Sequence, residues 1–209
     1  MGTALLGFPG FGVEYDETKN PYFKMIMVEN LRLIASKPLG KQLLDSIAAA
    51  KPASRADFPS GVNVMCQPVK IHYFESGQKP QWSYGADYSK NLVGMAPSSH
   101  PKHNIKGCPF HISGTSFNEA VDQSQTAKGG TVCRMAFSNA QIIETTGAVC
   151  WPHIVLAHEL IHSLHCLTGT HAGENEEAKT TGIGDFASEA MSDNAMRKAF
   201  GLPARDSYG

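Results

Sequence analysis

The sequence has no long apolar run, no excess of charge of either sign and no closely spaced cysteines. Its 209 residues include 18 basic and 19 acidic side chains, which gives a formal net charge of −1. A surface that binds nucleic acid or another polyanion needs a basic excess, and this chain has none. A membrane-spanning helix needs about 18 consecutive apolar residues, and the sequence contains no such stretch. We therefore expect no nucleic acid and no membrane among its partners.

The sequence also lacks the signatures of a disulfide scaffold and of a Sec signal peptide. Its five cysteines are far apart and form no C-x-x-C pair, so neither a zinc ribbon nor a redox motif is indicated. Residues 1–7 carry no basic side chain and too short an apolar stretch for a Sec signal. A chain of this length can bury a sizeable core, and we expect a single domain over residues 1–209.

The clearest motif in the chain is H-E-L-I-H at residues 158–162. On a helix, residues four apart project from one face, so the imidazoles of His158 and His162 can hold a single ion. Glu159 lies beside the first of them, where it can take a proton from a water on that metal. The pattern H-E-x-x-H therefore predicts a zinc site with two histidine ligands and a glutamate base.

The residues around this motif favour a helix. Pro152 suits the first helical turn, and Gly169 is typical of the position just past a helix end. Apolar Val155, Leu156 and Leu160 can pack one side of the helix while the histidines face a cleft. The alternative is an ordinary amphipathic helix whose histidines are packed or solvated and hold no metal. The five-residue pattern alone leaves that alternative open.

The remaining segments are expected to form the scaffold. Residues 1–18 are rich in glycine and are predicted to be an irregular N-terminal arm. Helical periodicity over residues 21–50, interrupted at Pro38, predicts a helical pair. A last helix is expected after Ser192, which is a suitable N-cap.

Three short segments are typical of β-strands. We expect Val62–Cys66 and Lys70–Phe74 to pair with each other, and Thr131–Phe137 to form a strand shortly before the metal helix. Between them the chain is rich in glycine, proline, serine and asparagine, which predicts short strands and turns around a cleft.

The spacing leaves the third metal ligand open. A carboxylate is a suitable third protein ligand beside two histidines, and several carboxylates lie downstream of the helix. The candidates are Glu174, Glu176, Glu177, Asp185, Glu189 and Asp193.

Three motifs that occur in order resemble one known family. They are H-E-L-I-H, E-E-x-K-T-x-G at residues 176–182 and G-L-P-x-R-x-x-Y at residues 201–208. Together they resemble the NleD-type zinc metallopeptidases among bacterial type III effectors, over roughly the last sixty residues. They are more distantly similar to clostridial neurotoxin light chains, in which arginine stands in place of Lys179 and a longer stretch separates the helix from the glutamate pair.

The resemblance implies roles for particular residues. Alignment with the neurotoxin light chains makes Glu177 the third zinc ligand, and Glu176 then steadies a ligand histidine. Arg205 and Tyr208 would donate to the oxyanion of the tetrahedral intermediate. His165 matches a position that does not ligate the metal, and it is expected to be structural.

A second resemblance competes for the third ligand. The segment E-A-M-S-D at residues 189–193 resembles the E-A-x-S-D of thermolysin-like enzymes, in which the glutamate ligates zinc. That pattern would select Glu189. We expect Glu177, because its threonine and glycine context matches as well, and we keep Glu189 as the alternative.

The resemblance also implies a fold and a function. The fold is α+β: a zincin-like single domain with a small, mainly antiparallel sheet on the H-E-x-x-H helix and an N-terminal helical pair. The function is a secreted endopeptidase with one Zn²⁺ per chain, delivered into the host cytoplasm to cut a host signalling protein. NleD-type members act on mitogen-activated protein kinases. We expect a monomer. The alternatives are a toxin domain in competition between bacteria and an inactive H-E-x-x-H protein that serves as a binding module.

Overall fold

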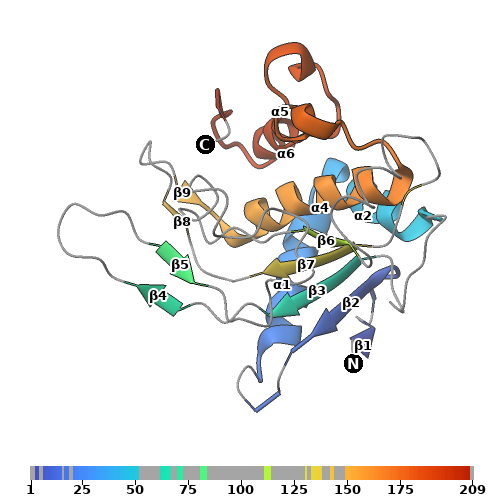
Figure 1. Cartoon of the computed structure of the whole chain (residues 1–209), viewed down its shortest axis with the longest axis vertical. Helices are drawn as coiled ribbons and strands as arrows, with labels where there is room; N and C mark the ends of the chain where they lie inside the picture. The colour runs from blue at the N-terminus through green and yellow to red at the C-terminus, as the bar shows by residue number, and fades with distance from the viewer. Residues whose placement is uncertain are drawn as a thin grey trace.

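The structure is a computed structural model that describes residues 3–4, 7–15, 17–18, 21–51, 62–66, 70–72, 81–83, 111–113, 130, 133–137, 142–143 and 149–207. A five-stranded sheet lies on one side of the central helix α4 (Pro152–Thr168), as Figure 1 shows. Four further helices pack around α4; they are α1 (Phe23–Ala35), α2 (Pro38–Ala49), α5 (Glu176–Thr181) and α6 (Asp193–Ala199). The 3-10 turns η3 (Gly173–Asn175) and η4 (Gly184–Phe186) flank α5.

The main sheet has the strand order β1-β2-β3-β7-β6. In that order its strands are Thr3–Ala4, Phe11–Glu14, Val62–Cys66, Cys133–Phe137 and His111–Ser113. The central pairs β2–β3 and β3–β7 are parallel, whereas β1 and β6 add antiparallel edges. Two antiparallel pairs lie outside this sheet: β4 (Lys70–His72) with β5 (Gln81–Ser83), and β8 (Ile142–Ile143) with β9 (Val149–Cys150).

The main sheet is thus mixed, whereas the sequence predicts a mainly antiparallel one. Strand β2 is followed by α1 and α2, and a connection through helices returns the chain to a parallel neighbour, here β3. The predicted pairing of Val62–Cys66 with Lys70–Phe74 is also wrong, because β3 pairs with β2 and β7 while β4 pairs with β5. Local hydrophobic pattern marks a strand but does not select its partner.

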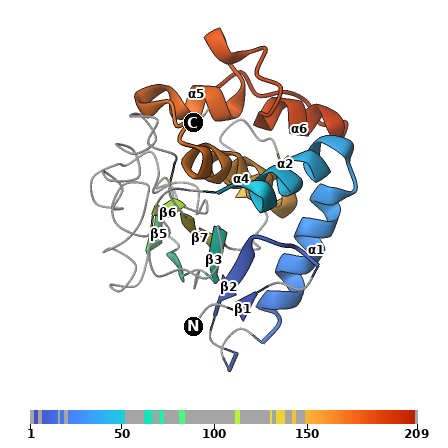
Figure 2. The same cartoon turned by 90° about the vertical axis from the view of Figure 1, so that its right-hand side faces the viewer.

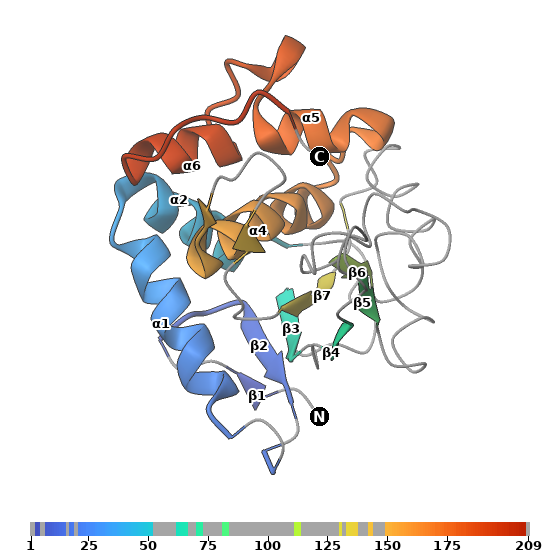
Figure 3. The same ribbon diagram turned by 90° about the vertical axis from the view of Figure 1, so that its left-hand side faces the viewer.

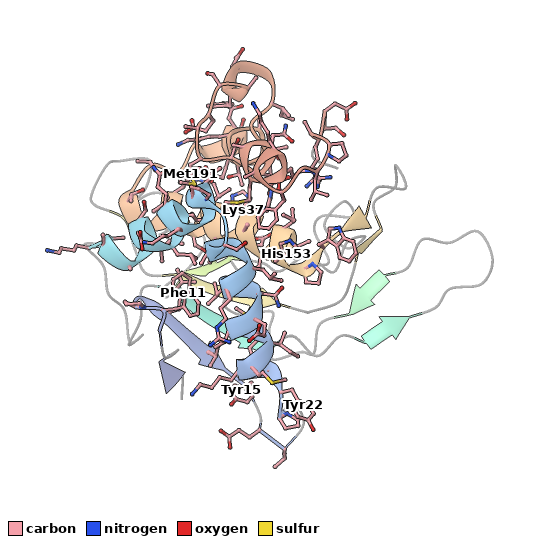
Figure 4. All side chains as sticks on the ribbon, turned by 180° about the vertical axis from the view of Figure 1, so that it is seen from behind. Phe11, Tyr15, Tyr22, Lys37, His153 and Met191 are labelled. Atoms are coloured by element: carbon pink, nitrogen blue, oxygen red, sulfur yellow. The ribbon has the colours of Figure 1, made fainter. Side chains whose placement is uncertain are left out.

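The N-terminal segment contains strand β2, where the sequence predicts an irregular arm. Phe11 and Val13 alternate with Gly12 along this strand, and their side chains are 2% and 1% exposed. Both belong to the core that the helical pair also lines; Phe11 is labelled in Figure 4. Two inward apolar residues are too few to signal a strand within a glycine-rich segment.

The helical pair is confirmed, and Pro38 is the first residue of α2, a position where its missing N–H costs nothing. Figures 2 and 3 show both helices beside α4. Their buried apolar side chains recur at helical spacing: Met27, Leu31 and Ile34 in α1, and Leu43 and Ile47 in α2. No helix in the described part of the chain is long and apolar enough to cross a membrane.

Candidate metal centre

Helix α4 carries the H-E-x-x-H motif through the middle of the molecule. Pro152 occupies its first turn, and Gly169 ends it in the left-handed conformation, with φ 72°. Most of the helix is buried, because the sheet lies on one side and α5 and α6 pack on the other. The predicted helix is confirmed, and its histidines face α5.

Three side chains converge on one point between α4 and α5. Nε2 of His158 lies 3.1 Å from Nε2 of His162. In the Glu177 carboxylate, Oε2 lies 3.6 Å from Nε2 of His158, and Oε1 lies 3.5 Å from Nε2 of His162. Among the described residues, this is the one group of three histidine, cysteine, aspartate or glutamate side chains close enough to share a metal ion.

The triangle of ligand atoms has the dimensions of one face of a zinc tetrahedron. Bonds of about 2.0–2.1 Å at tetrahedral angles separate neighbouring ligand atoms by about 3.3–3.4 Å. The three separations here, 3.1, 3.5 and 3.6 Å, bracket that value. The Glu177 side chain is 39% exposed, whereas the His158 side chain is 13% exposed. The residues present fit a zinc ion.

Glu189, the alternative third ligand, lies elsewhere. Its backbone N–H donates to Phe186, and its carbonyl accepts from the hydroxyl of Ser192. Among the described residues, the group close enough to share a metal ion is His158, His162 and Glu177, and Glu189 is not part of it. The structure therefore brings Glu177, and not Glu189, to the two imidazoles.

Glu176 contacts His162 at Nδ1, the ring nitrogen that does not face His158. Its Oε1 accepts from Nδ1 of His162 at 3.0 Å and from Nδ1 of His165 at 2.6 Å. The hydroxyl of Thr180 donates to the same oxygen at 3.1 Å, and the N–H of Ala172 donates to Oε2 at 2.7 Å. These bonds fix the ring of His162 and turn its Nε2 toward the metal position. His165 joins the same cluster without facing that position.

The charges around His162 follow from this arrangement. Burial disfavours an ionised carboxylate at Glu176, yet the hydrogen bonds from His162 and His165 more than offset it and hold its pKa well below the usual range. Burial likewise disfavours a charged His162, but the carboxylates of Glu177 and Glu176 raise its pKa well above 6.5. The two carboxylates thus favour the protonated form of His162 when no metal is bound.

Glu159 is buried beside the triangle, with 7% of its surface exposed. Burial, together with the negative charges of Glu177 and Asp193, raises its pKa to about 8, against an opposing effect of His162. A bound dication would favour the ionised form and shift that pKa back down. The carboxylate is thus poised to exchange a proton near neutral pH.

The other residues of the E-E-x-K-T-x-G segment hold α5 in place. Lys179 donates through Nζ to the carbonyl of Thr170 at 2.7 Å. Gly182 ends α5 in the left-handed conformation, and a Cβ there would lie 2.5 Å from the hydroxyl oxygen of Ser192. Only glycine allows this approach. Because Ser192 is the N-cap of α6, the glycine brings the start of α6 against α5.

Asp193 is the first residue of α6 and lies beside the first motif histidine. Its Oδ2 is 3.9 Å from Nδ1 of His158 and 3.4 Å from Nη1 of Arg205. The Asn194 side chain makes two hydrogen bonds to the backbone of Arg205. Its Oδ1 accepts from the Arg205 N–H at 2.6 Å, and its Nδ2 donates to the Arg205 carbonyl at 2.8 Å. Arg205 therefore lies one side chain away from His158. Tyr208 lies outside the described residues.

The family model of the M91 peptidases, described as effector proteins, matches residues 12–208.

The chain belongs to the M91 peptidase family.

Solved structures similar to this M91 chain include two botulinum neurotoxin light chains, each 14% identical to it. For serotype HA the TM-score is 0.43, and the match covers 89% of this chain and 48% of the light chain. For type G the TM-score is 0.42, with 100% and 62% covered. The chain thus spans about half to three fifths of the length of these light chains. No curated protein matches the sequence.

The sequence motifs do not predict the roles of two residues at the M91 site. Thr180 lies within the predicted segment, but its hydrogen bonds to Glu176 and His162 were not anticipated. Asn194 gave no signal, since asparagine in the first turn of a helix is common. The sequence offers Asp193 only as a possible metal ligand, whereas the structure places its carboxylate near Nδ1 of His158.

Proposed function

We propose that this M91 peptidase is a zinc-dependent endopeptidase with His158, His162 and Glu177 as its metal ligands. The observation that carries the proposal is the convergence of their three ligand atoms at tetrahedral separations beside the buried carboxylate of Glu159. Two neutral histidines and a carboxylate are a ligand set typical of catalytic zinc, which keeps a fourth position open. Membership of a peptidase family supports the same reaction.

The chain's own residues supply the proton transfers. A bound zinc ion would polarise the scissile carbonyl and lower the pKa of a water. Glu159 takes a proton from the attacking water and passes it to the leaving amine. Its burial excludes competing solvent, and a bound dication would favour the ionised form that accepts the proton.

Arg205 and Tyr208 are proposed as donors to the developing oxyanion. A guanidinium and a phenol can both donate to charge that appears in the transition state. The placement of Arg205 beside Asp193, one side chain from His158, supports this for the first of the pair. The substrate is proposed to lie extended along β6, which is one of the two edge strands of the main sheet among the described residues and packs beside α4.

The proposed substrate is a host signalling protein, with a mitogen-activated protein kinase as the specific candidate. Effector membership supports delivery into a host cell. The test incubates purified kinases and a general protein substrate with protein that has been stripped by chelator, and with the same protein reloaded with zinc. We expect stoichiometric zinc and discrete fragments only after reloading. Failure to bind zinc would reject the proposal; cleavage of the general substrate alone would reject the kinases.

A further inference from the structure

The two motif histidines have different surroundings at their second ring nitrogen. Nδ1 of His162 meets Glu176 at 3.0 Å. Nδ1 of His158 is buried and, within the described residues, has no hydrogen-bond partner. Its nearest acidic neighbour there is Asp193, whose Oδ2 lies 3.9 Å away.

Asp193 is itself an unusual buried acid. It is 1% exposed, and in the described part of the chain its Oδ1 has no hydrogen-bond partner. A carboxylate is rarely buried without a charged partner, because the loss of hydration costs several kcal/mol. Arg205 supplies that partner through Nη1, at 3.4 Å from Oδ2.

The chemistry of a metal-bound imidazole connects these two observations. Once Nε2 of a histidine donates its lone pair to a metal, Nδ1 carries the proton and seeks an acceptor. Glu176 is that acceptor for His162. For His158 the nearby acceptor is Asp193, whose Oδ2 lies 3.9 Å from Nδ1.

We propose that Asp193 is a positioning residue that accepts a hydrogen bond from Nδ1 of His158 and so holds this imidazole toward the metal, with Arg205 as its counter-charge. This inference rests on the proposed zinc function. It assigns to each ligand histidine a carboxylate of its own: Glu176 from α5 and Asp193 from α6.

The fold is built to deliver Asp193 to this place. The Ser192 hydroxyl accepts from the N–H of Ala195 and fixes the start of α6. Gly182 lets that start approach α5 closely. Asn194 donates to the carbonyl of Gly182 at 3.3 Å and clasps Arg205 on its other side. Residues from three segments therefore converge to set the position of one carboxylate.

A purely structural role would give a different result from a positioning role. An ion pair that only holds α6 to the tail would change the stability of the metal-free protein and leave zinc affinity alone. A positioning role changes zinc affinity itself. The readouts are therefore the melting temperature of the metal-free protein, the zinc dissociation constant by chelator competition, and the visible absorption of the Co²⁺-loaded protein, which reports the geometry at the metal.

The variants are Asp193→Ala and Asp193→Asn, with Asp206→Asn as the control because Asp206 is an exposed acid of the same tail. We expect Asp193→Ala to weaken zinc binding by about 10- to 100-fold, the usual effect of losing the partner of a ligand histidine, and to alter the Co²⁺ spectrum. Asp193→Asn keeps an acceptor oxygen, so its loss should be about tenfold. Asp206→Asn should bind zinc as the parent does.

Zinc affinity and Co²⁺ spectra equal to the parent in folded Asp193→Ala would overturn the inference while leaving the proposed function intact. If Asp193→Ala does not fold, Asp193→Asn decides by the same readouts, since it preserves shape. An unmodified protein that binds no zinc would instead remove the proposed function.

Discussion

Glu176 and Glu177 are adjacent in the sequence yet reach His162 from opposite sides of its ring. Oε1 of Glu176 lies 3.0 Å from Nδ1, and Oε1 of Glu177 lies 3.5 Å from Nε2. A single turn of α5 thus supplies both the partner of a ligand histidine and the candidate third ligand. The two consecutive glutamates therefore have different proposed roles, and different effects are expected when each is replaced.

Replacing Glu176 should weaken both zinc binding and the fold. In Glu176→Gln, the amide cannot accept at both of its ends, so at least one donor among His162, His165 and Ala172 loses its partner. We expect zinc affinity to fall by about 10- to 100-fold and the free energy of unfolding of the metal-free protein to fall by about 1–3 kcal/mol at pH 7. Exposed Glu174→Gln is the matched control.

The stability difference should depend on pH in a defined direction. The pKa of Glu176 is lower in the folded protein than its ordinary 4.5. Its stabilising contribution is therefore present above pH 4.5 and is lost as pH falls toward the folded-state pKa. Denaturant titrations of parent and variant should converge on acidification. A difference that grew below pH 4.5 would contradict this account of the carboxylate.

Replacement of the two candidate ligands separates the two sequence resemblances. Glu177→Ala removes one corner of the ligand triangle and should abolish tight zinc binding. Glu189→Ala should leave it nearly unchanged, because Glu189 is not among the described side chains that converge with the two imidazoles. Competition with a chromogenic chelator measures both. Loss of zinc from the Glu189 variant would favour the thermolysin-like pattern instead.

Glu159→Gln should retain zinc and lose proteolysis. The amide keeps the size of the side chain but cannot accept the proton of the attacking water. We expect about one zinc per chain and a rate lower by about three decades or more, which combines the loss of the general base with poorer activation of the water. Atomic absorption and the cleavage rate of one substrate provide the two measurements. Full activity in this variant would remove Glu159 from the mechanism.

Zinc binding should release protons, because the metal-free site holds protons that zinc must displace. The pKa of His162 is raised well above 6.5 and that of Glu159 to about 8. At pH 7 both groups are mainly protonated without metal. We expect release of about one to two protons per zinc and an affinity that falls as pH is lowered. Calorimetry in buffers of different ionisation enthalpy counts the protons, and a heat independent of buffer would contradict the prediction.

The sequence predicts the parts of this site that are local and leaves out those set by tertiary contacts. One helix is defined by Pro152, the two motif histidines and Gly169. The spacing of these residues therefore predicts the helix and the face that carries both imidazoles. Selection of Glu177 needed a motif, because several downstream carboxylates have the right chemistry. Asp193 and His158 lie on two different helices, whose relative placement depends on Gly182. No sequence pattern in either helix predicts that these two residues lie close together.

The same distinction holds for the scaffold. The helical pair is long and periodic, and the sequence predicts it correctly. Strand β2 buries two side chains in a glycine-rich segment, for which the sequence predicts an irregular arm. The parallel pairing of β2 with β3 depends on where the helical pair packs, which is a property of the whole fold and not of either strand.

The last prediction concerns the tail, where Arg205 has two proposed roles that can be separated. Tyr208→Phe removes a proposed oxyanion donor and touches no metal ligand partner. We expect kcat to fall by about one to three decades, with a smaller change in KM and no change in zinc affinity.

Arg205→Ala should lower kcat by a similar factor, but it should also weaken zinc binding, because Asp193 loses its counter-charge. Asn194→Ala keeps the guanidinium and removes the clasp on its backbone, so it should reproduce part of both losses. If Arg205→Ala lowered kcat with zinc affinity unchanged, Arg205 would be an oxyanion donor alone. If it weakened zinc binding and left the kcat of the zinc-saturated enzyme unchanged, its contact with Asp193 would be its whole contribution.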